Sequence, residues 1–319
     1  MGEIRHLQYV AFSSAGSHGF LFQGVLDALE EHVADYEEWC ASLRGIAGTS
    51  AGALVALILA LSISREKRDS IFAYLSDMNN ILQCPDVTLM ISSFGFYDGN
   101  TLRGIVRDVL TYGGLSPNAT MADLRRLLKL DVVFVAHNLV TCTPVHLSAS
   151  TAPHMFVYDA VFCSCAVPLV FAPLKYGDAL LCDGAMTESV PNVFPTDSTL
   201  FVIVPPSKED VCMTSWHDMM HCFSRVAIAP QCARIEALLT SPNTLVAYHP
   251  LMDSVRTLDL QMDVKKARVI CRLGYMAAVL YLYLDSVSSA LSIAVRAYVE
   301  CGRGITLSSE ASPDSEDEY

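Results

Sequence analysis

Basic residues are scarce in this chain. Its 319 residues include 21 Lys and Arg against 34 Asp and Glu, which gives a formal net charge of −13. A protein that binds nucleic acid usually gathers positive charge on one surface, so the sequence predicts no nucleic-acid partner. The acidic balance also provides no electrostatic attraction to anionic lipid surfaces.

The two common glycine-rich phosphate-binding motifs are missing as well. A loop of small residues, Ser13–Gly19, follows the predicted strand Leu7–Phe12 and precedes the predicted helix Phe20–Glu31. It lacks both G-x-G-x-x-G and a closing Lys-Ser or Lys-Thr pair, which excludes the dinucleotide fingerprint and the Walker pattern. Such a loop still directs several backbone N–H groups at one point, which suits either an oxyanion hole or an ordinary tight turn.

A secretory apolar segment is absent from the first residues, and the eleven cysteines are scattered through apolar segments. This pattern is typical of free, buried thiols in a reducing compartment, so we expect a cytoplasmic protein, with peripheral membrane attachment as an additional location. Leu273–Val295 is apolar and nearly long enough to span a bilayer, but Asp285 and several serines interrupt it. We predict a buried helix there, with membrane association as the alternative.

Internal repeats and Pro/Gly-rich linkers are absent too, while apolar residues make up 52% of the chain, which is enough for a large core. Predicted strands and helices alternate, as in a mostly parallel sheet covered on both faces. Further helices are predicted at Arg103–Leu110 and Met121–Leu130, and further strands at Asp131–Ala136, Thr143–Ser148, Leu180–Cys182 and Leu200–Pro205. We therefore predict one α/β domain over residues 1–307 and an acidic, disordered tail at 308–319.

The most informative motif in the sequence is Gly48–Gly52, which reads Gly-Thr-Ser-Ala-Gly. It lies between a predicted strand, Leu43–Ala47, and a predicted helix, Ala51–Leu61, the setting in which G-x-S-x-G forms a nucleophile elbow. Small residues at Gly48 and Gly52 leave room for the sharp turn. The turn presents Ser50 at a helix N-terminus, where backbone N–H groups favour developing negative charge. Ser50 is the candidate nucleophile, and a simple strand–helix turn is the alternative.

An aspartate follows a later apolar strand, in the sequence Asp183–Ala185. Asp-Gly is a common turn dipeptide, and a second copy occurs at Asp98–Gly99. The residues alone therefore leave open which aspartate has a chemical role.

These elements, in this order and at this spacing, resemble the patatin-like phospholipase family. In that family a glycine-rich oxyanion loop comes first, G-x-S-x-G carries the nucleophile, and Asp-Gly-Gly or Asp-Gly-Ala carries the base. The resemblance is strongest over residues 5–205 and includes the connecting segments Phe20–Leu26, Tyr97–Leu102, Ala160–Pro173 and Ser189–Asn192. It implies a three-layer α/β sandwich, with a mostly parallel central sheet and helices on both faces.

The resemblance also implies that the reaction is acyl transfer by a Ser50–Asp183 dyad. Ser50 lies in the G-x-S-x-G motif, and Gly184 and Ala185 complete the Asp-Gly-Ala motif of Asp183. Ser50 would attack an ester carbonyl, and Asp183 would accept its proton and later activate water. The candidate oxyanion donors are the amides of Gly16, Ser17, Gly19 and Ala51. We expect a lipid acyl hydrolase that acts on phospholipid or other acylglycerol esters at a membrane or lipid-droplet surface. The resemblance implies no metal or other cofactor.

The oxyanion loop departs from the family pattern at three positions. Ser14 and Ala15 stand where the family usually has glycines, so their β-carbons are expected to disfavour positive φ. His18 stands where the family has Lys or Arg, and histidine titrates near neutral pH. We expect activity to weaken as His18 deprotonates, unless its side chain points to solvent. The departures also support a second interpretation, a catalytically weak or inactive lipid-binding protein of the same fold.

Two other segments invite a functional interpretation. His217–His221 resembles a zinc-protease helix with Asp in place of Glu, but no third ligand follows at the expected spacing. We predict a structural or solvent-facing helix there, and a zinc peptidase is the alternative. The apolar run Val87–Ile91, which includes Met90, precedes Phe94 and Phe96. This stretch is predicted to flank the pocket and touch lipid, with burial in the core as the alternative.

Overall fold

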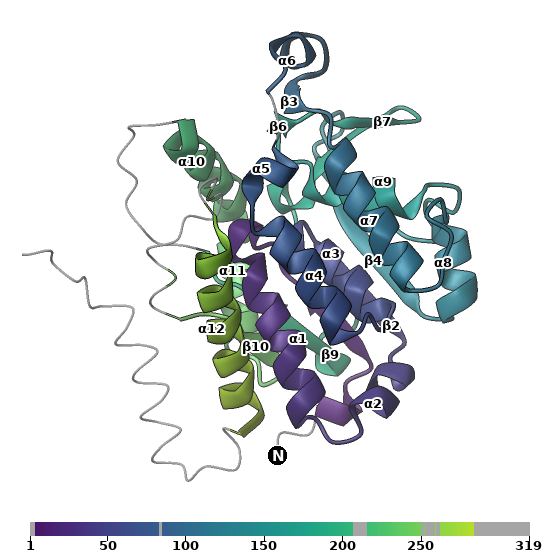
Figure 1. Cartoon of the computed structure of the whole chain (residues 1–319), viewed down its shortest axis with the longest axis vertical. Coiled ribbons are helices and arrows are strands. Elements are labelled where there is room, and N and C mark those ends of the chain that lie inside the picture. Colours follow the sequence, from purple (N-terminus) through teal and green to yellow (C-terminus); the bar gives the residue numbers. More distant parts are fainter. Residues whose placement is uncertain are drawn as a thin grey trace, which may run out of the picture.

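The computed structural model describes residues 4–82, 85–206, 216–249, 252, 259 and 262–283. The predicted acidic tail, 308–319, and the part of the apolar segment Leu273–Val295 that follows Tyr283 lie outside these residues. Figure 1 shows a central sheet surrounded by helices.

Eight strands form the central sheet, in the order β10-β9-β1-β2-β4-β8-β7, with β5 also paired to β4. They are β1 (Tyr9–Phe12), β2 (Gly45–Thr49), β4 (Asp131–Asn138), β5 (Thr143–Leu147), β7 (Leu174–Tyr176), β8 (Ala179–Asp183), β9 (Thr199–Ile203) and β10 (Thr244–Val246). The five strands from β10 to β4 are parallel, whereas β5, β8 and β7 are antiparallel to their neighbours. The predicted mostly parallel sheet is confirmed.

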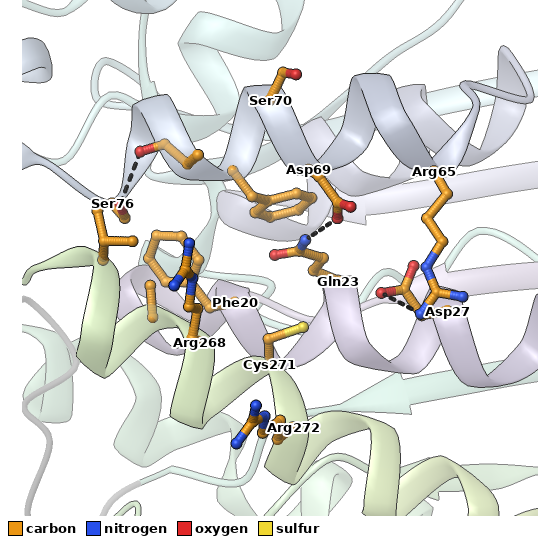
Figure 2. Close-up of a pocket in the computed structure, with 14 residues that line it drawn as sticks. Phe20, Gln23, Asp27, Arg65, Asp69, Ser70, Ser76, Arg268, Cys271 and Arg272 are labelled. Carbon is orange, nitrogen blue, oxygen red and sulfur yellow. Dashed lines mark hydrogen bonds and ion pairs between the residues drawn. The ribbon is translucent and has the colours of Figure 1, made fainter.

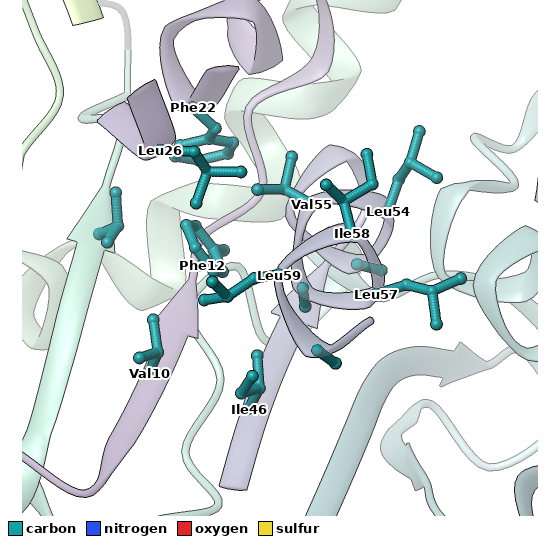
Figure 3. Packing of buried hydrophobic residues seen from close by; sticks show 14 of the residues in the cluster. Val10, Phe12, Phe22, Leu26, Ile46, Leu54, Val55, Leu57, Ile58 and Leu59 are labelled. Atoms are coloured by element: carbon teal, nitrogen blue, oxygen red, sulfur yellow. The ribbon is translucent and has the colours of Figure 1, made fainter. Parts of the chain in front are cut away.

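Both faces of the sheet carry apolar residues, which explains why helices pack against both faces. Along β1, Val10 and Phe12 belong to the main core cluster, whereas Ala11 belongs to a second cluster with residues of α11 (Cys232–Leu239). Side chains alternate between the two faces of a strand, so these clusters lie on opposite sides of the sheet. Figure 3 shows Phe12 next to Leu59 of α3 (Ala51–Ala60) and Val10 farther along the same strand. The predicted sandwich is therefore confirmed.

The helices of the main core include α1 (Phe20–His32), α7 (Asn100–Tyr112), α9 (Val157–Cys165) and α12 (Val264–Tyr283), in addition to α3. Helices α2 (Tyr36–Ser42), α4 (Arg65–Leu75) and α8 (Met121–Leu128) also contribute buried residues to this core. The structure further describes α5 (Met78–Ile81), α6 (Val87–Ser93) and α10 (Trp216–Ile228). A second, two-stranded sheet pairs β3 (Gly95–Tyr97) with β6 (Leu169–Phe171). Neither α4 nor this small sheet was predicted from the sequence.

Two glycines let α12 pack closely against α1. A β-carbon on Gly24 would lie 1.8 Å from Cys271 O, and one on Gly274 would lie 2.0 Å from Leu21 O. Residues Leu273, Ala278 and Leu282 of α12 are buried in the core, so the described part of the apolar segment is a packed helix. None of the helices in the described residues is both long and apolar enough to cross a membrane.

Candidate active site

The turn between β2 and α3 has the geometry of a nucleophile elbow. Ser50 has φ 55° and ψ −126°, a conformation that residues with a β-carbon rarely adopt. A β-carbon on Gly48 would lie 2.2 Å from Gly52 O, and one on Gly52 would lie 2.4 Å from Ser13 O. The close approach of these backbones explains why glycine is needed on both sides of Ser50.

The sheet brings Asp183 to this elbow although 133 positions separate the two residues in sequence. Strand β4 lies between β2 and β8, pairing Thr49 with Val135 and Ala136 with Asp183. Ser50 Oγ donates a hydrogen bond of 2.7 Å to Asp183 Oδ2. Both residues are buried, with 7% of Ser50 and 4% of Asp183 exposed.

The surroundings of Asp183 adjust its affinity for a proton. Burial raises the pKa of Asp183 to about 6, and hydrogen bonds from Ser50 Oγ and Ala185 N oppose this rise. Ala185 N donates to Asp183 Oδ1 at 2.8 Å, so each carboxylate oxygen has one partner. A carboxylate with a pKa near 6 is a better proton acceptor than a free aspartate, whose pKa is about 3.9.

The other Asp-Gly pair has a different setting. Asp98 is exposed, and its carboxylate accepts hydrogen bonds of 2.8 Å from Asn100 N and 2.5 Å from Asn100 Nδ2. It therefore stabilises the turn that begins α7. The structure places Asp183, and not Asp98, against Ser50.

The glycine-rich loop lies against the first turn of α3. Gly16–Gly19 forms a short 3-10 helix, and Gly16 has φ 53°. A β-carbon on Gly19 would lie 2.9 Å from Ala51 Cβ, so these two candidate donors are neighbours. Ala51 is the first residue of α3, where a backbone N–H has no acceptor within the helix. Ser17 Oγ accepts a hydrogen bond of 2.8 Å from Asp259 N.

The residues that depart from the family pattern fit the loop without backbone strain. Ala15 has φ −149°, and Gly16 is the residue of the loop with positive φ, so the expectation that Ser14 and Ala15 disfavour the loop conformation is wrong. Ser14 N donates 2.7 Å to Ser189 O, and the two hydroxyls lie 2.6 Å apart. Ser14 thus ties the loop to the segment that follows Asp183.

His18 is 5% exposed. The alternative that its side chain points to solvent is therefore wrong, because the ring is enclosed within the loop region. The titration of His18 as a control of activity stays a prediction.

The structure does not describe the candidate ligand side chains of the predicted zinc motif, His217–His221. Its residues fall on α10, but the side chains of His217, Asp218 and His221 lie outside what the structure describes. Elsewhere in the described part of the chain, no group of three or more His, Cys, Asp or Glu side chains could hold a metal ion.

A groove of about 490 Å³ opens between α1, α4 and α12 (Figure 2). It begins at Phe20, the residue after Gly19, and its walls combine apolar side chains such as Phe72 with Arg65 and Arg268. Neither residue of the Ser50–Asp183 pair lines it. The groove therefore adjoins the glycine-rich loop without containing the pair.

Comparisons with known proteins identify a family and neighbours of similar fold. The model of the family described as "Patatin-like phospholipase" matches residues 10–192, more than half of the chain. No curated protein sequence matches. Among solved structures, VipD from Legionella pneumophila superimposes with a TM-score of 0.53 at 16% identity, covering 87% of this chain and 67% of VipD. The type III effector ExoU, of Pseudomonas aeruginosa, has a TM-score of 0.46 at 14% identity, covering 86% of this chain and 52% of ExoU.

The chain belongs to the patatin-like phospholipase family. The matched region contains the glycine-rich loop, the elbow and Asp183, and the VipD likeness supports the fold alone. Family membership defines the coarse activity as hydrolysis of lipid esters. The chain spans about two thirds of VipD and about half of ExoU.

Proposed function

We propose that this protein is a serine lipid acyl hydrolase in which Ser50 is the nucleophile and Asp183 is the general base. The observation that carries the proposal is the 2.7 Å hydrogen bond from Ser50 Oγ to Asp183 Oδ2, formed at a strained elbow on the sheet. Because the serine hydroxyl already points its proton at the carboxylate, Asp183 can act on it directly, without a histidine between them.

The reaction then follows in two steps. Ser50 Oγ attacks the ester carbonyl while its proton passes to Asp183 Oδ2, and the candidate N–H donors of Gly16, Ser17, Gly19 and Ala51 stabilise the oxyanion. Asp183 returns the proton to the leaving alcohol, which leaves an acyl group on Ser50. Asp183 next takes a proton from water, whose oxygen attacks the acyl carbonyl. Asp183 then returns this proton to Ser50 Oγ as the fatty acid leaves, which restores both residues.

Labelling with a fluorophosphonate tests the proposal, because this reagent reacts with activated serines. We expect wild-type protein to be labelled, and peptide mapping to locate the label on Ser50. We also expect the protein to hydrolyse at least one ester in a mixed panel of phospholipids and acylglycerols. An unlabelled, folded protein that still binds the lipids would contradict the proposal and favour the lipid-binding alternative.

The pH profile of hydrolysis should have an acidic limb set by Asp183. The base must be ionised to accept a proton, and the pKa of Asp183 is raised to about 6, chiefly by burial. Activity at low substrate concentration should therefore rise about tenfold per pH unit below pH 6, and this acidic limb should end once Asp183 is ionised. Initial rates on a soluble ester between pH 4.5 and 8 measure this. Far-UV circular dichroism over the same range controls for unfolding, and a flat profile would contradict the assignment.

We also propose that α6 contacts the lipid surface. Val87, Ile91 and Phe94 are 63%, 77% and 63% exposed, so the alternative that these side chains form core is wrong for these three residues. Val87 and Ile91 are four residues apart, which places them on one side of α6, and Phe94 is the residue that follows the end of the helix. Figure 1 shows α6 at one end of the molecule, with β3 and β6 between it and the main body. An exposed apolar face on a lipid hydrolase fits an interface with acyl chains.

Ile91→Ser and Phe94→Asn, made separately, should each weaken binding to phosphatidylcholine vesicles by about tenfold, since each change removes an apolar side chain worth roughly 1–2 kcal/mol. Asn is chosen because Phe94 has φ 63° and Asn tolerates that conformation. Leu127→Ser on α8 is the matched control, because Leu127 is also exposed but lies on a different helix. Vesicle co-sedimentation measures binding, and equal binding by all variants would remove the proposal.

A further inference from the structure

The backbone of Ser50 needs support from outside its own strand and helix. Its φ of 55° and ψ of −126° are unfavourable for a residue with a β-carbon and persist only where the surroundings fix them. The conformation also determines where Oγ lies, so whatever holds the backbone also holds the nucleophile.

Two adjacent side chains at the end of α9 contact this backbone directly. Ser50 N donates to Ser164 Oγ at 2.9 Å, and Ser164 Oγ donates to Val135 O at 2.5 Å. A hydroxyl has one proton, and because Val135 O receives it, the oxygen is left as an acceptor for Ser50 N. On the other side of the residue, Cys165 Sγ donates to Ser50 O at 3.0 Å.

The next residue along the chain contacts the proposed base. Ala166 O accepts a hydrogen bond of 2.9 Å from Asp183 N. Val135 O lies close to Gly184, the residue after the base, since a β-carbon on Gly184 would come within 2.2 Å of it. Residues 164–166 and β4 therefore hold the nucleophile and the base relative to each other.

We propose that Ser164 and Cys165 are positioning residues, which clamp the backbone of Ser50 and, with Ala166, set the distance between Ser50 Oγ and the Asp183 carboxylate. The inference rests on the proposed function of that pair. Ser164 is completely buried, so it acts through Ser50 and not by contact with substrate. Its hydroxyl should contribute more than the Cys165 thiol, because a thiol is a weak donor.

Substitution separates positioning from general stability. Ser164→Ala leaves Ser50 N and Val135 O buried without this partner, and we expect kcat to fall about tenfold to hundredfold with KM within twofold. Cys165→Ala should lower kcat about threefold to tenfold, whereas Cys165→Ser should restore it, because a hydroxyl can donate to the same carbonyl.

The measurements are kcat and KM on a soluble ester, the rate of fluorophosphonate labelling of Ser50, and the thermal unfolding midpoint. Cys163→Ala is the control, because Cys163 lies on α9, is as buried as Ser164, and its thiol makes no hydrogen bond to Ser50 or Asp183 in the described residues. It should lower the unfolding midpoint while kcat stays within twofold of wild type.

Normal kcat in both Ser164→Ala and Cys165→Ala would overturn the clamp, as would an equal loss of kcat in Cys163→Ala. If Ser164→Ala does not fold, the pair Cys165→Ala and Cys165→Ser decides: a loss restored by Ser supports the clamp, and no loss overturns it. Wild-type protein that is not labelled at Ser50 would overturn the proposed function together with the clamp, whereas a labelled wild type with insensitive variants overturns the clamp alone.

Discussion

Ser50→Ala is expected to abolish ester hydrolysis. The substitution removes the oxygen that would form the acyl intermediate, and residues that act as one unit lose nearly all activity singly, by up to about a million-fold in well-studied hydrolases. Ser50 is buried and its Oγ contacts Asp183, so the deleted atom belongs to the proposed reaction centre. Release of fatty acid from the ester identified in the lipid panel measures the effect, and activity within tenfold of wild type would contradict the assignment.

Asp183→Asn should have a similarly large effect, because an amide cannot accept the serine proton. The folded protein should survive the change. The pKa of Asp183 is raised to about 6 by burial, above the value of about 3.9 expected in the unfolded chain. Ionisation of Asp183 therefore lowers stability as pH rises from about 4 through 6. At pH 8 the neutral amide should leave the unfolding midpoint equal or higher, so lost activity cannot be attributed to unfolding.

Asp98→Asn is the matched control for this experiment. Asp98 also precedes a glycine, but it is exposed and bonds to Asn100. We expect near-normal turnover from it. A variant at Asp183 that keeps near-normal turnover would show that the base lies elsewhere.

Arg68→Met is expected to lower the free energy of unfolding by about 3–5 kcal/mol. Arg68 is a buried cation on α4, which donates to Asp27 Oδ1 at 2.8 Å, to Ile63 O at 3.0 Å and to Glu30. Asp27 is itself buried, so removal of the guanidinium leaves its charge without its nearest partner. The free energy of unfolding obtained from urea titration measures the loss.

Arg65→Met provides the comparison, because Arg65 also contacts Asp27 but at 3.7 Å and with half of its side chain exposed. Exposed ion pairs contribute about 1 kcal/mol or less, so this variant should remain close to wild type. Figure 2 shows Arg65 beside Asp27 at the rim of the groove. Equal losses from the two variants would mean that burial does not control the strength of these ion pairs.

Much of the fold could be predicted from local patterns. The strand–loop–helix units around Ser13–Gly19 and Gly48–Gly52 follow from apolar runs interrupted by small residues, and the structure has β1, α1, β2 and α3 there. The predicted helix Met121–Leu130 corresponds to α8 (Met121–Leu128). The small sheet of β3 and β6 escaped prediction, because its strands have three residues each and are too short for a periodic signal.

Of the two residues of the candidate site, one can be recognised from a local motif and the other cannot. The sequence by itself identified Ser50 as the candidate nucleophile, because the glycines at positions 48 and 52 are a local requirement of the elbow. It did not distinguish Asp183 from Asp98 without a family resemblance, because both stand in the same dipeptide. Only the tertiary structure decided between them, by placing β8 beside β4 and so bringing Asp183 within 2.7 Å of Ser50 Oγ.

Burial and long-range hydrogen bonds were likewise decided by the tertiary structure. The sequence left open whether His18 faces solvent, and it gave no role to Ser164 or Cys165, although Ser164 lies in a segment that resembles the family. Periodicity and turn chemistry depend on residues a few positions apart and can be recognised in a sequence. The contacts of Ser50 with residues 164 and 165 span more than a hundred positions, so they exist only once strand order and helix packing are fixed.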